Sequence, residues 1–282
     1  MSEQNITPEL RRWLQEQQRA GVAPEQVLKA MQSSGWTPDV ALQALAGVFN
    51  AEALAPLRIA AAPAAPVPEP ALQGAPTSLW AHDREVKVLL SMAAPRLVVF
   101  GGLLSDEECV ALRESAATRL ARSETVAVDA DGSEINTART SRGMFFDRGE
   151  TELCCRIEAR IAALLNWPIE NGEGLQVLHY QPGAEYLPHY DYFEPNNASS
   201  AAILQRGGNR VGTLVMYLNT PLRGGGTIFP NIKLEVAPVQ GNAVFFSYDR
   251  PHPSTLTLHG GTPVLEGEKW VATKWMRQGV FE

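Results

Sequence analysis

The spacing of apolar residues differs between the beginning of the chain and the rest. Over residues 1–50 the apolar positions recur every three or four residues, as in the stripe of Leu10, Trp13 and Leu14, which is the period of one face of an α-helix. Proline opens and glycine closes successive stretches here, which is the usual order at the two ends of a helix. The pattern therefore predicts a small module of three short helices.

A proline- and alanine-rich stretch follows at residues 51–76. It holds six prolines, and a proline inside a helix removes a hydrogen bond and clashes with the preceding turn. The stretch also lacks the apolar density of a core. We expect a semi-rigid linker here, partly in the polyproline II conformation.

The third part of the chain, residues 77–282, begins with helices among strands and then turns to short β-runs. Ser105, with Glu108 three residues later, forms a capping box at the start of one helix, and apolar residues at helical spacing predict another over Glu150–Leu165. From Gly174 onward, short runs rich in β-branched and apolar residues are separated by glycine and proline. This order predicts an α+β fold in which helices buttress a double-stranded β-helix, or jelly roll.

Composition and charge limit the classes of function. The 282 residues suit one large domain and a small one, and a net charge of -7 argues against a nucleic-acid partner. No apolar run approaches the about 18 residues that span a bilayer, and the N-terminus lacks the apolar core of a signal peptide. The three cysteines lack zinc-binding spacing and are expected to be reduced core thiols. We therefore expect a cytoplasmic protein without membrane or nucleic-acid contacts.

The sharpest chemical signal is the pair His189 and Asp191, two residues apart. In an extended strand, residues i and i+2 point to one face, so an imidazole and a carboxylate would project side by side. Two histidines and one carboxylate on one face of an octahedron form the metal site of non-haem Fe(II) oxygenases. The third ligand would have to come from later in the chain, which offers only His252 and His259. By itself, the pair is more typical of solvated polar residues on a strand edge, so its surroundings have to support a metal site.

A larger constellation surrounds this pair. In order along roughly residues 95–277, the motifs resemble the catalytic domain of the prolyl 4-hydroxylase family of 2-oxoglutarate- and iron-dependent dioxygenases. The preserved order of many motifs carries the resemblance, and the helical module and the linker lie outside it. The motifs are Ser105–Cys109, Arg139–Ser141, Gln176–Gly183, His189–Phe193, Arg210–Leu218, Gly224–Pro230, Pro238–Phe246, His259–Trp270 and Thr273–Trp275.

The resemblance implies that His189, Asp191 and His259 bind Fe(II), which leaves His252 as a loop residue. Lys269 follows His259 by ten residues, as the family pattern requires, and would hold the distal carboxylate of 2-oxoglutarate. Dioxygen and L-ascorbate complete the implied cofactors. The resemblance further assigns Tyr180 and Thr227 as hydrogen-bond partners of that carboxylate, Tyr186 and Trp275 as pocket walls, and Arg210 and Tyr192 as residues beside the substrate.

The charge of Lys269 and the geometry of its strand add two further arguments for its role in binding the co-substrate. A carboxylate bound in a cavity needs a fixed cation, because an unpaired buried charge is costly. Taken alone, Lys269 is more typical of a solvated lysine beside Glu268, and it is the neighbouring His–Asp–His set that favours the co-substrate role. The family usually has an acidic residue before the threonine of its Gly-Gly-x-Thr segment, where this chain has Gly226. Alternation along a strand predicts one face made of Lys269, Val271, Thr273 and Trp275 and another made of Trp270, Ala272 and Lys274.

Three functions are compatible with these observations. The first is 4-hydroxylation of prolyl residues in a peptide or protein, as the resemblance implies. The second is the same chemistry on another amino-acid side chain or a free amino acid, because function is decided by the site and not by the fold. The third is a β-barrel that binds metal or docks a protein without catalysis. Its functional part would be the N-terminal helices, which resemble the ubiquitin-associated three-helix modules. Lys269 favours an enzyme, because a non-catalytic barrel has no need of a cation there.

Overall fold

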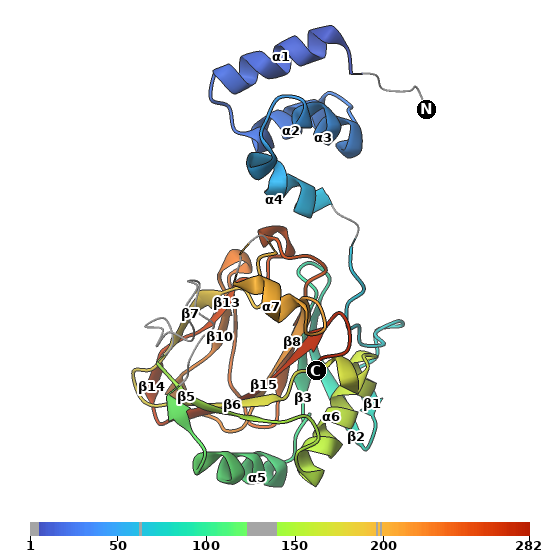
Figure 1. Cartoon of the computed structure of the whole chain (residues 1–282). Coiled ribbons are helices and arrows are strands. Elements are labelled where there is room, and N and C mark those ends of the chain that lie inside the picture. Colours follow the sequence, from blue (N-terminus) through green and yellow to red (C-terminus); the bar gives the residue numbers. More distant parts are fainter. Residues whose placement is uncertain (1–5, 62–63, 123–139, 196, 198) are drawn as a thin grey trace. The chain divides into compact units, whose positions relative to one another are not determined.

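The computed structural model describes residues 6–61, 64–122, 140–195, 197 and 199–282 (Figure 1). Arg139, the first residue of the Arg139–Ser141 motif, therefore lies outside the described residues. Contacts divide the chain into two compact units, one ending at Ala64 and the other beginning at Ala65. No helix within the described ranges is both long and apolar enough to cross a membrane.

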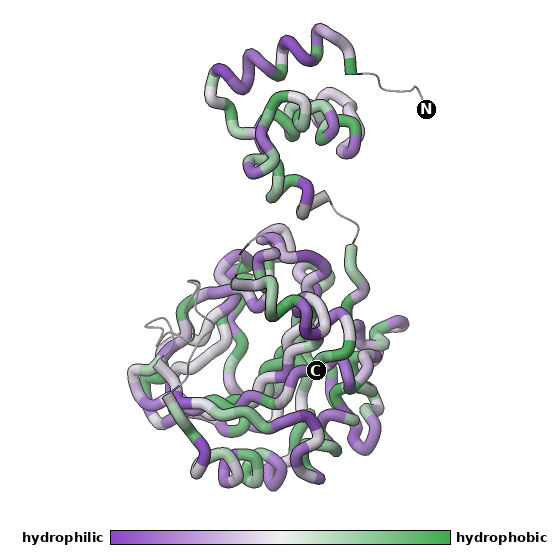
Figure 2. The backbone as a smooth tube through the Cα atoms, in the orientation of Figure 1, coloured by the Kyte–Doolittle hydropathy of each residue, from purple (hydrophilic) through white to green (hydrophobic). Residues whose placement is uncertain are grey.

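The first unit is helical throughout its described length. The side chain of Thr7 accepts a hydrogen bond from the backbone N–H of Leu10 and caps the first helix. Leu14, Met31 and Leu45 are almost fully buried and form the centre of its core, while hydrophilic stretches alternate with hydrophobic ones along that helix (Figure 2). The helices are α1 Pro8–Arg19, α2 Pro24–Ser33, α3 Pro38–Ala46 and α4 Ala51–Ala61.

Helix α4 corrects the prediction that residues 51–76 form a linker. The helix runs through Pro56, which we expected to prevent it. Leu54 and Leu57 are buried in the core of the first unit, and the side chain of Asn50 accepts a hydrogen bond from the N–H of Ala53 at the start of the helix. Burial of the two leucines offsets the hydrogen bond that Pro56 cannot donate.

The second half of the expected linker is also different, because it belongs to the second unit. Pro68 and Pro70 are buried, and the N–H of Glu69 donates to the carbonyl of Leu165 at 2.9 Å. The Glu69 carboxylate also forms an ion pair with Arg96. Gly212 lies where Pro68 packs, since a Cβ there would be 3.1 Å from the Pro68 ring. A polyproline segment is rigid and pairs little of its own backbone, so it can dock on a neighbouring surface.

The second unit combines antiparallel sheets with helices, which confirms the predicted mixture. Two helices cover one face of the larger sheet, and a smaller sheet lies against the other face (Figure 1). The helices are α5 Asp106–Ala117, α6 Glu152–Leu165 and α7 Ser200–Leu204, with 3-10 turns η1 Ile169–Asn171, η2 Pro230–Ile232 and η3 Pro253–Thr255. The strands are β1 Ser78–Ala81, β2 Arg84–Met92, β3 Leu97–Gly101, β4 Ala121–Arg122, β5 Arg142–Phe146, β6 Leu175–Tyr180, β7 Tyr186–His189, β8 Arg210–Tyr217, β9 Arg223–Gly224, β10 Thr227–Phe229, β11 Leu234–Val236, β12 Ala243–Ser247, β13 His259–Gly261, β14 Val264–Glu266 and β15 Lys269–Arg277.

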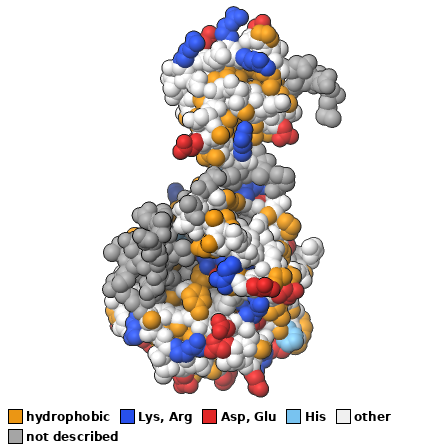
Figure 3. Space-filling view, viewed as in Figure 1, with side chains coloured by type: hydrophobic (Ala, Val, Ile, Leu, Met, Phe, Trp, Pro, Cys, Tyr) orange, Lys and Arg blue, Asp and Glu red, His pale blue; other side chains and the backbone are white. Residues whose placement is uncertain are grey.

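The order of the strands places β15 near the middle of the larger sheet. That sheet has nine strands in the order β1-β2-β3-β12-β8-β15-β6-β5-β4, the smaller one has the order β11-β10-β13-β7, and β14 pairs with β9. Every residue of β15 is buried. Two facing antiparallel sheets of this kind are consistent with a jelly roll. On the face of this unit drawn in Figure 3, acidic and basic side chains are interspersed among neutral ones.

Each face of the larger sheet has its own core. On one face, Leu112 of α5 and Ile157 of α6 pack in a cluster with Leu214 and Ala272. On the other, Tyr217 and Phe246 pack with Phe229 of the smaller sheet. The candidate site lies between the two sheets, in a pocket lined by residues of β6, β7, β8, β10, β13 and β15.

Candidate metal centre and pocket

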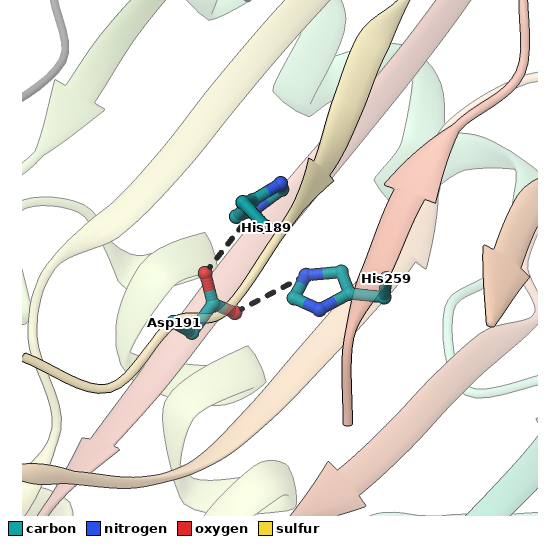
Figure 4. Close-up of side chains that lie close together, drawn as sticks. All are labelled: His189, Asp191 and His259. Atoms are coloured by element: carbon teal, nitrogen blue, oxygen red, sulfur yellow. Dashed lines mark ion pairs between the residues drawn. The ribbon is translucent and has the colours of Figure 1, made fainter. Parts of the chain in front are cut away.

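Three side chains meet between the two sheets (Figure 4). They come from strand β13, from the end of strand β7 and from the bend that follows β7. His259 opens β13 and pairs directly with His189 at the end of β7, while Asp191 follows two residues later. Nε2 of His189 lies 3.5 Å from one carboxylate oxygen of Asp191, and Nε2 of His259 lies 3.4 Å from the other. The three ligand atoms lie within 4.8 Å of one another, so one ion can reach all three.

Backbone carbonyls fix the orientation of both imidazoles. Nδ1 of His189 lies 2.9 Å from the carbonyl of Leu187, and Nδ1 of His259 lies 2.9 Å from that of Thr257. A carbonyl only accepts, so each Nδ1 carries the proton and each Nε2 presents a lone pair. Burial lowers the pKa of His259 to about 4, so its ring is neutral near pH 7. This is the protonation state that metal binding requires.

Asp191 is buried and presents an ionised carboxylate. Burial alone would raise its pKa, but His259 and His189 beside it, with Arg210 nearby, hold the pKa far below its usual range. The hydroxyl of Thr213 donates to the Oδ2 atom of Asp191 at 2.7 Å. The donor set of two imidazoles and one carboxylate therefore fits Fe(II).

A pocket opens directly beside this group. Lys269 reaches it from the first residue of β15, and its side chain is buried but forms no ion pair with any residue that the structure describes. Burial lowers the pKa of Lys269 to about 8, against a smaller opposing effect of Glu235. The lining residues are Gln176, Leu178, Tyr180, Tyr186, His189, Asp191, Thr213, Val215, Thr227, His259, Gly260, Gly261, Lys269, Val271, Thr273 and Trp275.

Four further residues assigned from the sequence all line this pocket. Nζ of Lys269 lies 5.5 Å from the ring centroid of Tyr180. The hydroxyl of Thr227 accepts from Tyr217 at 2.9 Å, which leaves its own proton for another acceptor. The Tyr186 ring stacks on His189 at 3.8 Å. Trp275, the fourth, has a buried indole N–H without a hydrogen-bond partner in the part of the chain that the structure describes.

The two residues assigned to the substrate lie beside the pocket and do not line it. Arg210 forms a two-pronged ion pair with Glu173, at 2.7 and 2.9 Å, and its guanidinium lies 3.9 Å from the ring centroid of Trp275. Tyr192 is buried and stacks on Tyr190, and its hydroxyl has no hydrogen-bond partner among the described residues. Arg210 is thus already paired, and it supports the pocket wall from behind.

The remaining histidines lie elsewhere. Nδ1 of His252 accepts from the N–H of Ser254 and caps η3, so His259 is the histidine that the fold brings to the pair. His179 lies 2.7 Å from the Glu268 carboxylate and stacks on Trp270, on the opposite face of the sheet from Tyr180. His82 occupies a turn with a positive φ. The placement of His252 agrees with its assignment as a loop residue.

Several residues at the site carried no signal in the sequence analysis. Thr213 donates to the metal-site carboxylate, and Glu173 pairs with Arg210 and also with Arg277. The Glu235 carboxylate lies over Gly226, where an added Cβ would come within 2.2 Å of it. A carboxylate is therefore present at that position from β11, although the chain lacks one at residue 226. Alternation along β8 could have indicated Thr213, but the others depend on strand register.

Comparison with known proteins agrees with this geometry. Residues 175–277 match the model of the 2OG-Fe(II) oxygenase superfamily. The chain is 40% identical over 208 residues to the probable prolyl 4-hydroxylase 6 of Arabidopsis thaliana, which covers 66% of this chain and 70% of that protein. It is 39% identical over 209 residues to prolyl 4-hydroxylase 5 of the same plant, covering 67% and 70%.

A solved structure of a prolyl hydroxylase is also similar to this chain. The viral collagen prolyl hydroxylase of Paramecium bursaria Chlorella virus-1, in its 2-oxoglutarate complex, superposes with a TM-score of 0.51 at 30% identity, covering 64% of this chain and 95% of that one. The chain therefore belongs to the prolyl 4-hydroxylase family of 2-oxoglutarate- and Fe(II)-dependent oxygenases. As such it is an Fe(II)- and 2-oxoglutarate-dependent dioxygenase.

Proposed function

We propose that this enzyme hydroxylates prolyl residues at C4 in a peptide or protein. The observation that carries the proposal is the presence, in one pocket, of a His–Asp–His group and of a buried lysine without a described ion-pair partner. The relatives named as prolyl 4-hydroxylases support the choice of substrate. The sheets would form a double-stranded β-helix around this pocket.

His189, Asp191 and His259 would hold the Fe(II). The three leave the remaining positions of an octahedron free for the co-substrate and dioxygen. Bound iron supplies the oxidation of an unactivated C–H bond, coupled to decarboxylation of 2-oxoglutarate. The role of the protein is to hold the reactants in line and to keep water out of the site, and no side chain is required as a general base.

Lys269 would bind the distal carboxylate of 2-oxoglutarate. Its ammonium group is buried in a site where the charge has no described counter-ion, so an incoming carboxylate supplies the missing partner. The Thr227 hydroxyl, which accepts from Tyr217, is free to donate to that carboxylate. Tyr180, which pairs with Lys269 across the two strands, completes the group.

An aromatic wall at the mouth of the pocket would receive the prolyl ring. Phe145 of β5 pairs with Gln176, which lines the pocket, and Phe145 is 49% exposed. Its ring lies 6.5 Å from that of Trp275, which rests in turn on Arg210. The indole N–H of Trp275 is a donor without a described partner, suited to a carbonyl of the peptide. Arg210 and Tyr192 would shape this wall from behind.

The test is turnover of a proline-containing peptide. We expect succinate release that requires Fe(II), 2-oxoglutarate and the peptide, together with the gain of one oxygen atom on the proline by mass spectrometry. A matched peptide with alanine in place of proline is the control, and His259→Ala should be inactive. Turnover of a different side chain or of a free amino acid, with none on any prolyl peptide, would assign the same chemistry to another substrate.

Three finer expectations accompany the proposal. Ascorbate should restore activity lost during uncoupled turnover, which repeated assays with and without it would measure. A cytoplasmic location is supported by the three free cysteines Cys109, Cys154 and Cys155. The helical first unit would serve to dock a partner protein. An enzyme lacking residues 1–64 that keeps its affinity for small peptides but loses it for the whole target would support that role.

A further inference from the structure

A short chain of hydroxyl groups leads from the interior of the larger sheet to the metal-site carboxylate. Thr213 of β8 donates to Oδ2 of Asp191 at 2.7 Å, and the Tyr248 hydroxyl lies 2.9 Å from the same Thr213 oxygen. Thr213 is fully buried and Tyr248 is 2% exposed. All three groups are thus held in one contiguous, dry path.

The direction of the two hydrogen bonds in this series of hydroxyl groups is fixed. A threonine hydroxyl has a single proton, and here it goes to the carboxylate, which only accepts. Tyr248 must therefore donate to Thr213. Burial raises the pKa of Tyr248 well above its ordinary value, so the tyrosine keeps the proton that it donates. The order is Tyr248 to Thr213 to Asp191.

Asp191 needs this support more than the two histidines do. It lies in a bend after β7 and takes no part in a strand pairing. Each imidazole is oriented by a backbone carbonyl, whereas among the described residues Thr213 is the one non-histidine side chain that bonds the Asp191 carboxylate. The carboxylate would otherwise rotate about its side-chain bonds.

The backbone of Thr213 is held within the larger sheet, so its hydroxyl has a fixed position relative to Asp191. It pairs with Phe246 on β12 and with Trp275 on β15, so its backbone is held from both sides. Tyr248 directly follows β12 and its N–H donates to the carbonyl of Val211, also on β8. The hydroxyl groups of Tyr248 and Thr213 therefore link the larger sheet to Asp191, which lies just after strand β7 of the smaller sheet.

We propose that Thr213, supported by Tyr248, is a positioning residue that sets the Asp191 carboxylate for metal binding. The inference rests on the proposed function, since it takes His189, Asp191 and His259 as the iron ligands. Partners of this kind, which touch a ligand and not the metal, change metal affinity by about 10- to 100-fold when removed. Two substitutions of Thr213 separate its hydrogen bond to Asp191 from its contribution to packing. Thr213→Val keeps the volume and removes the hydroxyl, whereas Thr213→Ser keeps the hydroxyl.

The experiment is an anaerobic titration of the full chain with Fe(II), and with Co(II) as a coloured substitute whose absorption reports the ligand geometry. We expect Thr213→Val to weaken metal binding by about 10- to 100-fold and to change the Co(II) spectrum. Thr213→Ser should restore the spectrum of the unsubstituted protein. Tyr248→Phe should weaken binding by about 2- to 10-fold, the value of one neutral hydrogen bond.

Two controls keep the outcome decisive. Tyr192→Phe removes a buried tyrosine hydroxyl that bonds none of the residues described by the structure. The Tyr192 ring lies 6.0 Å from that of Tyr248, and the substitution should leave metal affinity unchanged. Thermal unfolding of the metal-free variants checks the fold. Should Thr213→Val not fold, Tyr248→Phe decides alone. Metal affinity equal to that of the unsubstituted protein in the folded variants overturns the inference only, whereas absence of metal binding in the unsubstituted protein overturns the proposed function as well.

Discussion

Two lysines on one strand show how the same residue serves opposite purposes on the two faces of the larger sheet. Lys269 and Lys274 both belong to β15 and are 4% and 3% exposed. Lys274 faces the helices and donates to Glu158 of α6, whose other oxygen accepts from the N–H of Gly149. Lys269 faces the pocket and has no ion-pair partner among the described residues.

The difference lies in whether the charge is already satisfied. Burial lowers the pKa of both lysines, but for Lys274 the nearby Glu158 opposes the effect directly. A complete buried pair holds the fold together, and breaking it leaves an uncompensated charge. A buried cation without an ion-pair partner among the described residues weakens the fold and is ready to receive an anion. The face of the sheet, and not the type of residue, decides between structure and function.

The strongest way to break this comparison is Lys269→Ala. We expect the affinity for 2-oxoglutarate to fall by about 1,000-fold, about 4 kcal/mol, because the bound carboxylate would be buried without its cation. Metal binding and the free energy of unfolding should stay close to those of the unsubstituted enzyme. Calorimetric titration with 2-oxoglutarate in the presence of Mn(II) measures the first quantity. Unchanged co-substrate affinity would remove Lys269 from the site.

The matching change on the other face is Lys274→Met. We expect a loss of about 3 kcal/mol in the free energy of unfolding, since Glu158 is left charged and buried with only the Gly149 N–H as a partner. Denaturant unfolding measures it. The double variant Lys274→Met with Glu158→Leu should recover most of the loss. If the single and double variants were equally destabilised, packing and not charge would be the cause.

The pH dependence of co-substrate binding should distinguish the two lysines further. With a pKa of about 8 in the unliganded pocket, Lys269 loses its charge as the pH rises. We therefore expect 2-oxoglutarate affinity to fall about tenfold between roughly pH 7 and pH 9. Lys269→Arg, which stays charged, should lose this dependence. A profile unchanged by Lys269→Arg would assign the titration to another group.

The same pKa shift predicts an opposite trend for the stability of the unliganded protein. Unfolding raises the pKa of Lys269 from about 8 to the model-peptide value of 10.5, so the unfolded chain binds more protons between these values. The free energy of unfolding should therefore rise with pH across that window, through this lysine. Denaturant unfolding of the unsubstituted enzyme and of Lys269→Met, compared at the two ends of the window, isolates the contribution.

The smallest expected effect concerns Phe145 and Met144 on β5. Like Lys269 and Lys274, these two residues lie on opposite faces of the larger sheet. Phe145→Ala should raise KM for a prolyl peptide by about fivefold, about 1 kcal/mol, with KM for 2-oxoglutarate unchanged. Met144→Ala, on the helix-covered face where Met144 is buried, should instead cost about 2 kcal/mol of stability. Steady-state kinetics with each substrate varied in turn measures the split. Equal effects on both KM values would place Phe145 in general support of the site.

Local patterns were sufficient for much of this picture. Alternation along β15 predicted that Lys269, Val271, Thr273 and Trp275 share a face, and all four line the pocket. The capping box at Ser105 and Glu108 is present, and the helix expected over Glu150–Leu165 is α6, Glu152–Leu165. In each case a short-range rule and the final packing agree, because one side of the element is buried along its whole length.

Features that depend on distant parts of the chain were not predictable in this way. Helix α4 exists because Leu54 and Leu57 meet a core made by the preceding helices, and the buried Pro68 and Pro70 need Gly212 and Leu165, far along the chain. Alternation along β8 could indicate which face Thr213 takes, but only the register of β8 against β12 and β15 brings it under Asp191. Tertiary burial overrides local preference at these places.

The most direct test of the central claim is an anaerobic titration of the Fe(II)-loaded enzyme with 2-oxoglutarate, followed by visible absorption. A 2-oxo acid that chelates ferrous iron produces a coloured complex. We expect this colour to develop and to saturate at one 2-oxoglutarate per chain, to be absent in His259→Ala, and to need far more 2-oxoglutarate in Lys269→Ala. Colour that forms equally well in all three proteins, or in none of them, would contradict a metal site built from His189, Asp191 and His259 beside Lys269.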